Sequence, residues 1–329
     1  MKLKTYIDDW SKEERRLYLK TIGNKLWRME HFYMIKDKAR QTVNLVLNPI
    51  QNVYWRNQTK RDYILKARKI GFSTLCLIDD LDETIWNRNF TSFIFAHKRE
   101  DVQKLFKIIQ FAYDRMPPEY KPKADYYNKN ELYFKEQGST IYVGMEARSD
   151  TINRLHVSEI CFIRDAEKKC AASFEAVPEG DGKIVLETTP NGVGGYAYEL
   201  YQFAAGYKTS QYGESSVFTP HFYPWFFHPE YKMPLTNSDR DMIKAEQYLN
   251  EEEKEFKEAH SLTFTQMKWR KVKQSTLGEQ FVEQYPEDDM SCFLGSGSPY
   301  FCQTALKGQL TPEKAGDAYF NMKKQMEEE

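Results

Sequence analysis

Hydrophobic and polar positions change their period along the chain, and this change predicts a helical arm followed by an α/β core. Residues 1 to 45 place Leu, Trp, Phe and Met among charged residues at helical spacing, which predicts one or two amphipathic helices. From residue 46 onward, short apolar runs alternate with amphipathic stretches. The apolar runs predict strands at 63–66, 91–96, 155–157 and 183–188, and the amphipathic stretches predict helices at 73–86, 99–116 and 196–204.

Strands that alternate with helices indicate a mostly parallel sheet with helices on both faces. Residues 131–135 and 140–145 instead predict a hairpin with Gln137-Gly138 at its turn. A proline-rich stretch at 219–234 precedes a charged, helical segment at 238–273. We therefore predict an arm at 1–45, a core at 46–235, and a helical subdomain at 236–329 that ends in a polar tail at 311–329.

Composition narrows the class of protein. The chain is 41% hydrophobic and 29% charged, and no apolar run approaches the ~20 residues that a membrane span needs. The first residues lack the pattern of a secretory signal, so we expect no membrane and a cytoplasmic location. The cysteines are odd in number, form no C-x-x-C pair and are predicted to be reduced: Cys76, Cys161, Cys170, Cys292 and Cys302. Because the net charge is −1, any nucleic-acid contact must come from local patches.

A basic, glycine-containing loop stands between a predicted strand and a predicted helix. It consists of Lys66, Ala67, Arg68, Lys69, Ile70, Gly71, Phe72, Ser73 and Thr74. A phosphate-binding (Walker A) loop needs a glycine, backbone N–H groups that open a helix, a cation and a hydroxyl for Mg²⁺. Gly71 and Ser73 fill two of these positions, whereas Lys66 stands at the first glycine and Phe72 at the usual lysine. Taken alone, a basic turn before a helix explains the loop equally well.

Other polar residues stand before and after the loop in the order that a phosphate-binding site of this kind would need. Gln51 precedes it by about fifteen residues, where an amide could read adenine. Glu159 ends a short apolar strand, as does the carboxylate that polarises the attacking water in a P-loop ATPase, and Ser158 stands beside it where aspartate is commoner. Thr188 and Thr189 end a further strand, where hydroxyls can sense the γ-phosphate. For each residue the alternative is an ordinary surface, strand-end or turn position.

In this order the residues resemble the ATPase domain of bacteriophage terminase large subunits. The resemblance spans roughly residues 45 to 301. It is carried by Gln51, the loop at 66–74, the block Arg148-Ser149-Asp150-Thr151 that leads into 155–159, and the segment TTPNG at 188–192. The later motifs at 223–226, 228–231, 269–270 and 284–286 also match.

The resemblance implies a P-loop NTPase fold of the ASCE or RecA-like class that binds ATP and Mg²⁺. Its cofactor-binding residues would be Gln51, for adenine, and the loop at 66–74, with Lys66 or Arg68 as the catalytic cation. Arg68 would also act as an arginine finger in cis, and Glu159 as the catalytic carboxylate. Thr188 and Thr189 would couple hydrolysis to movement, and Ser73, Ser158 and Glu159 would hold Mg²⁺ through water.

The implied partners are double-stranded DNA, a portal protein and a small terminase subunit, with a homo-oligomeric ring on the portal. The implied location is the host cytoplasm, with transient binding to the viral procapsid. Candidate DNA contacts are the basic run 268–273 and the looser group Lys121, Lys123 and Lys129, although a charge run is more often a solvated helix face. Only 28 residues follow Phe301, so we expect no nuclease domain and no cleavage activity from this chain alone.

Two other readings remain open at this point. A helicase-like ATPase stimulated by nucleic acid belongs to the same broad class, but it would need a strand-separating element that we do not identify. A catalytically silent assembly protein would keep the P-loop fold as a docking platform, and Phe72 at the lysine position is its best support.

Overall fold

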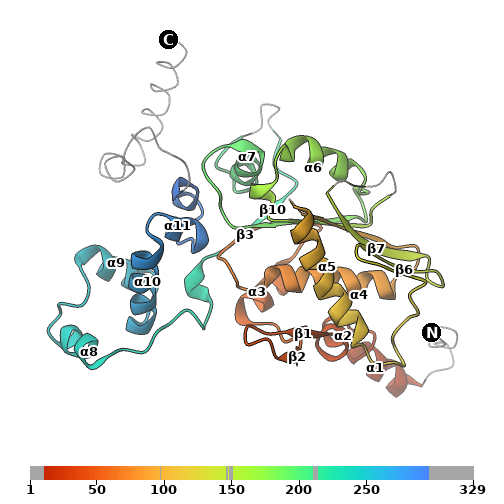
Figure 1. Ribbon diagram of the computed structural model, residues 1–329, viewed down its shortest axis with the longest axis horizontal. Helices are drawn as coiled ribbons and strands as arrows, with labels where there is room; N and C mark the ends of the chain where they lie inside the picture. The colour runs from red at the N-terminus through yellow and green to blue at the C-terminus, as the bar shows by residue number, and fades with distance from the viewer. Residues whose placement is uncertain (1–10, 97, 146, 148–150, 210–213, 296–329) are drawn as a thin grey trace, which may run out of the picture.

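A mostly parallel β-sheet forms the centre of the molecule. The computed structural model describes residues 11–96, 98–145, 147, 151–209 and 214–295. In this part of the chain the sheet has eight strands in the order β10-β3-β9-β8-β4-β7-β6-β5 (Figure 1). In chain order they are β3 (Arg61–Lys66), β4 (Thr91–Ala96), β5 (Tyr126–Tyr127), β6 (Glu131–Phe134), β7 (Ser139–Gly144), β8 (Arg154–Ser158), β9 (Lys183–Thr188) and β10 (Thr219–Tyr223).

The six strands from β10 to β7 are all parallel, and the hairpin strands β6 and β5 continue the sheet in antiparallel fashion. Strand β9 lies between β3, which leads into the basic loop, and β8, which ends before Glu159. This parallel order, with helices packed on both faces, is the doubly covered α/β sheet that the sequence predicts. The predicted fold class is therefore confirmed, as is the predicted hairpin of β6 and β7.

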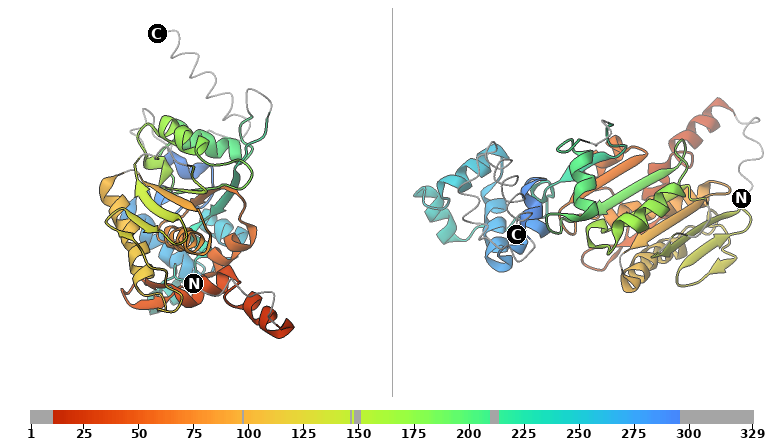
Figure 2. Two further views of the ribbon diagram at one scale, coloured as in Figure 1. Left: turned by 90° about the vertical axis from the view of Figure 1, so that its right-hand side faces the viewer. Right: turned by 90° about the horizontal axis from the view of Figure 1, so that it is seen from above.

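Helices cover both faces of the sheet, as the front and top views show (Figures 1 and 2). One face packs against α3 (Pro49–Asn57), α4 (Phe72–Trp86) and α5 (Arg99–Asp114), and the other against α6 (Ala166–Glu175) and α7 (Gly195–Ala204). Along β3, Ile64 belongs to the first core, whereas Tyr63 and Leu65 belong to the second. Side chains that alternate between two buried faces explain why this strand reads as a continuous apolar run.

The arm differs in part from the prediction of helix through residue 45. Helices α1 (Lys12–Lys20) and α2 (Lys25–Phe32) are present, but β1 (Met34–Lys36) and β2 (Thr42–Asn44) then form an antiparallel hairpin. The turn between them is closed by Asp37, whose carboxylate accepts the N–H of Gln41 at 2.7 Å, and it places Arg40 at a φ of 63°. A side chain that bonds its own turn competes with helix formation. The helical prediction is therefore wrong for residues 34–44.

A helical unit follows the sheet, next to the edge strand β10. It contains α8 (Asn237–Lys244), α9 (Glu251–Ala259), α10 (Phe264–Leu277) and α11 (Gln280–Gln284). Three short 3-10 turns complete the described elements: η2 (Ile160–Phe162), η3 (Trp225–Phe227) and η4 (Ser291–Gly295). Trp225 of η3 packs against Trp269 of α10 with ring centroids 4.7 Å apart, so the unit shares a core with the sheet. Strand β10 was not predicted, because Pro220 interrupts its pattern, and a sheet edge tolerates proline.

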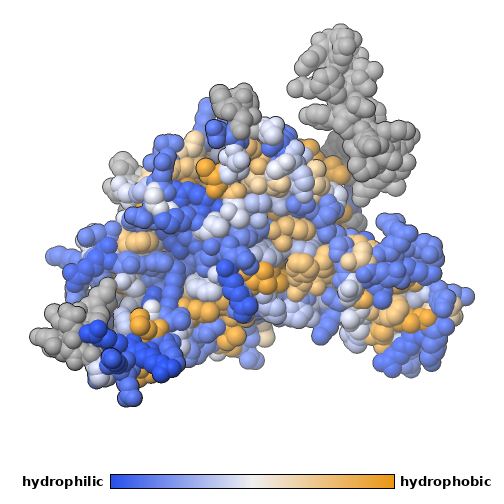
Figure 3. Space-filling view, turned by 180° about the vertical axis from the view of Figure 1, so that it is seen from behind, coloured by the Kyte–Doolittle hydropathy of each residue, from blue (hydrophilic) through white to orange (hydrophobic). Residues whose placement is uncertain are grey.

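Seen from behind, the molecular surface mixes hydrophilic residues with scattered apolar patches, some of them on the helical unit (Figure 3). None of the helices in the described ranges is long and apolar enough to cross a membrane.

Candidate nucleotide-binding site

The basic loop has the backbone of a helix N-terminus that is open to an anion. Lys69 and Gly71 both adopt left-handed conformations, with φ of 60° and 88°. Helix α4 begins directly after Gly71, and no side chain caps its first turn. A Cβ at Gly71 would lie 2.9 Å from the side-chain nitrogen of Gln51, so the glycine is required for both its φ and its space. A glycine-bearing loop that opens a long helix is a ready phosphate site.

Phe72 does not face this opening. It is 1% exposed and lies in an aromatic cluster, with ring centroids 5.5 Å from Tyr54 and 4.8 Å from Tyr223. The side chains of Ala67 and Ile70 are also buried, so these three predicted cofactor-binding residues could contact a nucleotide only through their backbone. A side-chain role for them is therefore excluded.

Two backbone groups of the loop are also occupied. The N–H of Ala67 donates to the Tyr223 carbonyl at 2.9 Å, and the N–H of Arg68 donates to the Gln284 carbonyl at 2.8 Å. The guanidinium of Arg68 is exposed and lies 3.3 Å from the side-chain oxygen of Gln284. Both the backbone and the exposed side chain of Arg68 are therefore hydrogen-bonded to Gln284 of α11.

Gln51 braces the loop from α3. Its amide nitrogen donates to the Gly71 carbonyl at 2.8 Å, and its amide oxygen accepts the N–H of Asn48 at 2.9 Å. The side chain is 4% exposed. Both groups that would read adenine are therefore engaged within the chain, and adenine recognition stays a prediction that requires one of these bonds to open.

Lys66 is the last residue of β3, and its side chain lies at the carboxyl end of the sheet, between Glu159 and Glu187, rather than in solvent. Its ammonium lies 3.2 Å from Glu159 Oε1 and 3.0 Å from Glu187 Oε2. Burial disfavours the charged ammonium, but the attraction of the two carboxylates outweighs burial and raises the pKa of Lys66 above its usual value. The cation of this loop is thus present, and it enters from the strand end.

Glu159 occupies the strained position that follows β8. Its φ is 55°, a left-handed conformation that a non-glycine residue adopts at a cost of about 1–3 kcal/mol. While Oε1 faces Lys66, Oε2 accepts the backbone N–H of Thr189 at 3.1 Å and lies 3.4 Å from the hydroxyls of Thr188 and Thr189. The predicted catalytic carboxylate therefore contacts both the loop cation and the predicted coupling pair.

A buried chain of charges that sequence reasoning missed lies behind these residues. Glu187 accepts the Ser158 hydroxyl at 2.8 Å and lies 3.6 Å from Nε2 of His156, whose Nδ1 is 3.1 Å from Asp80. Arg154 pairs with Asp80 and also with Asp79. The sequence did hold a signal for this cluster, because charged residues stand within strands and a helix whose other residues indicate complete burial.

The ionisation states of these buried charged side chains follow from the way they are paired. Burial disfavours the carboxylate of Glu187, yet Lys66 and His156 hold its pKa well below the usual value. Burial alone would lower the pKa of the His156 imidazole, but its bonds to Asp80 and Glu187 raise that pKa to about 9. His156 therefore carries a positive charge at neutral pH, and Glu187 stays ionised.

A cavity of about 510 Å³ opens next to these side chains, between the carboxyl ends of the strands and α11. Five predicted site residues line it: Arg68, Ser73, Ser158, Glu159 and Thr189. Lys66 and Thr188 lie directly behind Glu159. Gln51 and Lys69 do not line it, and Thr74 lines a separate cavity with Lys36 and Phe111. A volume in this range suits a small molecule or cofactor.

The fold has counterparts among solved structures. The large terminase of bacteriophage HK97 matches 87% of this chain and 58% of its own length, at 12% identity and a TM-score of 0.50. This chain shares the fold of phage large terminases. The large terminase ATPase domain of Thermus phage P74-26 matches 72% of this chain and 92% of its own length, at 12% identity and a TM-score of 0.47. No protein-family model matches the sequence, and neither does any curated protein.

The predicted resemblance to phage terminases is thus confirmed at the level of fold, and this chain spans 58% of the HK97 terminase. A third terminase, from a thermophilic bacteriophage, was solved in complex with ATP-γ-S and matches 58% of this chain and 46% of its own, at 11% identity and a TM-score of 0.34. The residues 148–150, which belonged to the resemblance, lie outside the described residues, as do Cys302 and the tail at 311–329.

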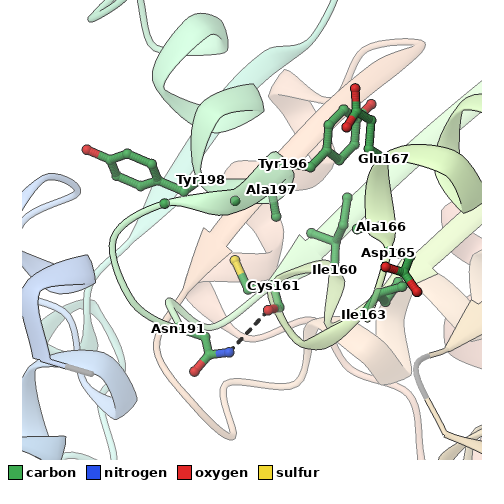
Figure 4. Close-up of a pocket in the computed structure, with 12 residues that line it drawn as sticks. Ile160, Cys161, Ile163, Asp165, Ala166, Glu167, Asn191, Tyr196, Ala197 and Tyr198 are labelled. Carbon is green, nitrogen blue, oxygen red and sulfur yellow. Dashed lines mark hydrogen bonds between the residues drawn. The ribbon is translucent and has the colours of Figure 1, made fainter. Parts of the chain in front are cut away.

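A second cavity of this terminase fold lies on the α6 and α7 side of the sheet (Figure 4). It measures about 260 Å³, and its lining in the described chain includes the carboxylates of Asp165 and Glu167 but no lysine or arginine. Asn191, next to the coupling pair, donates to the Cys161 carbonyl at its edge at 3.1 Å. An acidic lining is unsuited to a triphosphate, so this cavity does not compete for the nucleotide.

The basic run of the helical unit is largely paired within the chain. Arg270 is 9% exposed and forms two hydrogen bonds with Glu287, at 2.7 and 2.9 Å. Lys268 pairs with Asp239, and Lys271 with Glu253. These pairs indicate that the basic run stabilises the helical unit rather than forming an open DNA-binding face. For Arg270, the prediction of an exposed contact is wrong. In the looser group, Lys123 and Lys129 are exposed.

Proposed function

We propose that this chain is the ATP-hydrolysing motor domain of a terminase large subunit, which translocates double-stranded DNA into a viral procapsid. One observation carries the proposal: the Glu159 carboxylate joins the loop cation Lys66 to the coupling residue Thr189 at the wall of a cavity of about 510 Å³. A carboxylate that is linked both to a phosphate-binding loop and to a relay is what a hydrolysis-driven motor needs.

In this proposal the triphosphate of ATP enters the cavity with its charge directed toward the N-terminus of α4. The exposed guanidinium of Arg68 and the ammonium of Lys66 stabilise negative charge on the phosphoryl group. The hydroxyl of Ser73, on the first turn of α4, would hold Mg²⁺, and that ion would neutralise charge on the β- and γ-phosphates. Hydroxyl and carboxylate oxygens are ligands that suit Mg²⁺.

Glu159 would orient and deprotonate the attacking water, since its side chain is partly exposed to the cavity. Loss of the γ-phosphate changes the charge that Glu159 and Lys66 experience, and Thr188 and Thr189 are bonded to the same carboxylate. The loop after them reaches α11, because the Gly192 N–H donates to Glu283 at 3.1 Å. This path would carry the change to the helical unit, which would move with bound duplex.

The proposed partners follow from the same role: duplex DNA, a portal protein, a small terminase subunit, and further copies of this chain in a ring on the portal. The proposed site of action is the host cytoplasm, at the procapsid.

A steady-state ATPase assay tests the proposal. Wild type should hydrolyse ATP, with stimulation by duplex DNA, and Glu159→Gln should lower turnover by about 10²–10⁴-fold while nucleotide still binds. Arg68→Ala should cost about 10³-fold or more. The matched control is Glu167→Gln in the acidic cavity, which should leave turnover unchanged.

The outcomes separate the proposal from its alternatives. A wild type that binds no ATP and turns none over would point to an assembly platform. Stronger stimulation by single strands than by duplex would point to a helicase-like enzyme. Wild-type turnover in Glu159→Gln would remove the proposed catalytic role of this carboxylate.

A further inference from the structure

The proposed Mg²⁺ site lacks a carboxylate at the position where the sequence has Ser158. The carboxylate at the end of β8 is Glu159, which the proposed function uses for water. Ser158 is 4% exposed, and its hydroxyl donates to Glu187 Oε1 at 2.8 Å. The residue that replaces aspartate therefore points at a carboxylate on the neighbouring strand.

Ser73, at the start of α4, is a second neighbour of this carboxylate and contributes to holding the pKa of Glu187 low. Ser73 and Ser158 line the same cavity, so both hydroxyls that the sequence assigned to Mg²⁺ lie near one acidic group. Glu187 itself is fully buried in β9, at 0% exposure. Register places it beside Ser158, because Ser158 and Glu187 are paired across the β8–β9 ladder.

Glu187 retains the capacity to hold a cation. Its Oε2 is paired with the Lys66 ammonium at 3.0 Å and has no other polar partner among the described residues. Glu159 lies on the other side of the same ammonium, at 3.2 Å. Mg²⁺ sites in phosphoryl-transfer proteins use one or two carboxylates together with phosphates and several waters, so this donor set fits the ion.

We propose that Glu187, supplied by the strand inserted between β3 and β8, is the acidic partner of Mg²⁺ that Ser158 cannot be, and that it acts on the ion through bound water with Ser73 and Ser158 beside it. The proposal rests on the proposed function, because it assumes a Mg²⁺–nucleotide complex at this cavity. The Lys66 ammonium balances the charge of Glu187 in the structure.

The experiment measures metal affinity and metal-free nucleotide affinity separately. Mn²⁺ is titrated into the protein with the non-hydrolysable analogue AMP-PNP and followed by electron paramagnetic resonance, and fluorescent mant-ADP binding is measured in EDTA. Glu187→Gln should weaken Mn²⁺ binding by about 10- to 100-fold and leave mant-ADP binding in EDTA unchanged. Adding Ser158→Asp to Glu187→Gln should restore most of the Mn²⁺ affinity, because it returns a carboxylate to the neighbouring strand. Glu167→Gln is the matched control and should behave as wild type.

The results have distinct consequences. If Glu187→Gln keeps wild-type Mn²⁺ affinity, or loses mant-ADP affinity in EDTA by the same factor, Glu187 is only a counter-ion for Lys66 and the inference fails while the proposed function stands. If wild type binds neither nucleotide, the proposed function fails and the inference with it. Should Glu187→Gln not fold, Glu187→Asp keeps the charge but withdraws it from the Ser158 hydroxyl, and the same loss of Mn²⁺ affinity is required of it.

Discussion

The buried imidazole of His156 should stabilise the fold through its charge, and this stabilisation should disappear at alkaline pH. The bonds to Asp80 and Glu187 raise the pKa of His156 from 6.5 to about 9 against the effect of burial. At about 1.4 kcal/mol per pKa unit, the shift corresponds to about 3 kcal/mol of folding free energy. Because the folded pKa is the higher one, this contribution is complete below pH 6.5 and is lost as the pH rises through 9.

The assay compares chemical denaturation of wild type and His156→Gln at pH 6, 8 and 10. The difference between the two free energies of unfolding should shrink by about 3 kcal/mol over this range, because titrations of other groups cancel in the difference. A ¹H–¹³C NMR titration should place the His156 ring pKa near 9, with His156→Gln giving the assignment. A difference that stays constant or grows with pH, or a ring that titrates near 6.5, would refute the buried ion chain.

Three further changes have outcomes that the site geometry fixes. Glu159→Gln should retain mant-ADP affinity within error while it loses turnover, and loss of both in equilibrium binding would contradict its catalytic assignment. Gly71→Ala should cost about 1–3 kcal/mol of stability, because its φ is +88° and its new Cβ would lie 2.9 Å from Gln51; Gly180→Ala, with open space around it, should change little in the same denaturation assay. Phe72→Lys would restore the usual loop residue but bury an ammonium among aromatic rings, so thermal stability should fall and ATPase activity should not rise.

Much of the site was predictable because strands of a parallel sheet bring their carboxyl ends to one edge. The loop after β3, the carboxylate after β8 and the hydroxyls after β9 are far apart in sequence, yet that rule alone places them around one cavity. Gly71 was predictable for a similar reason, since a loop that meets phosphate needs a residue that tolerates a positive φ.

The remainder depended on contacts that sequence does not encode locally. Glu187 reads as one polar residue near the end of an apolar run, and only the strand order shows that it faces Lys66 and Ser158. Gln51 was assigned to adenine because its type and spacing fit, but the folded chain uses both of its amide groups for bracing. The hairpin at 34–44 was missed because its turn depends on backbone bonds between residues 37 and 41 and on the Asp37 side chain, which the apolar pattern does not reveal.

The shared ammonium of Lys66 links substrate binding to the readiness of Glu159. Lys66 lies between Glu159 and Glu187 and is paired with both carboxylates. A triphosphate in the cavity competes for that ammonium, and removal of Lys66 from a buried pair costs about 3–5 kcal/mol unless another cation replaces it. Mg²⁺ near Glu187 would be such a replacement. The Glu159 carboxylate would then be released from Lys66 only when nucleotide and metal are both bound, which would limit activation of water before both have bound.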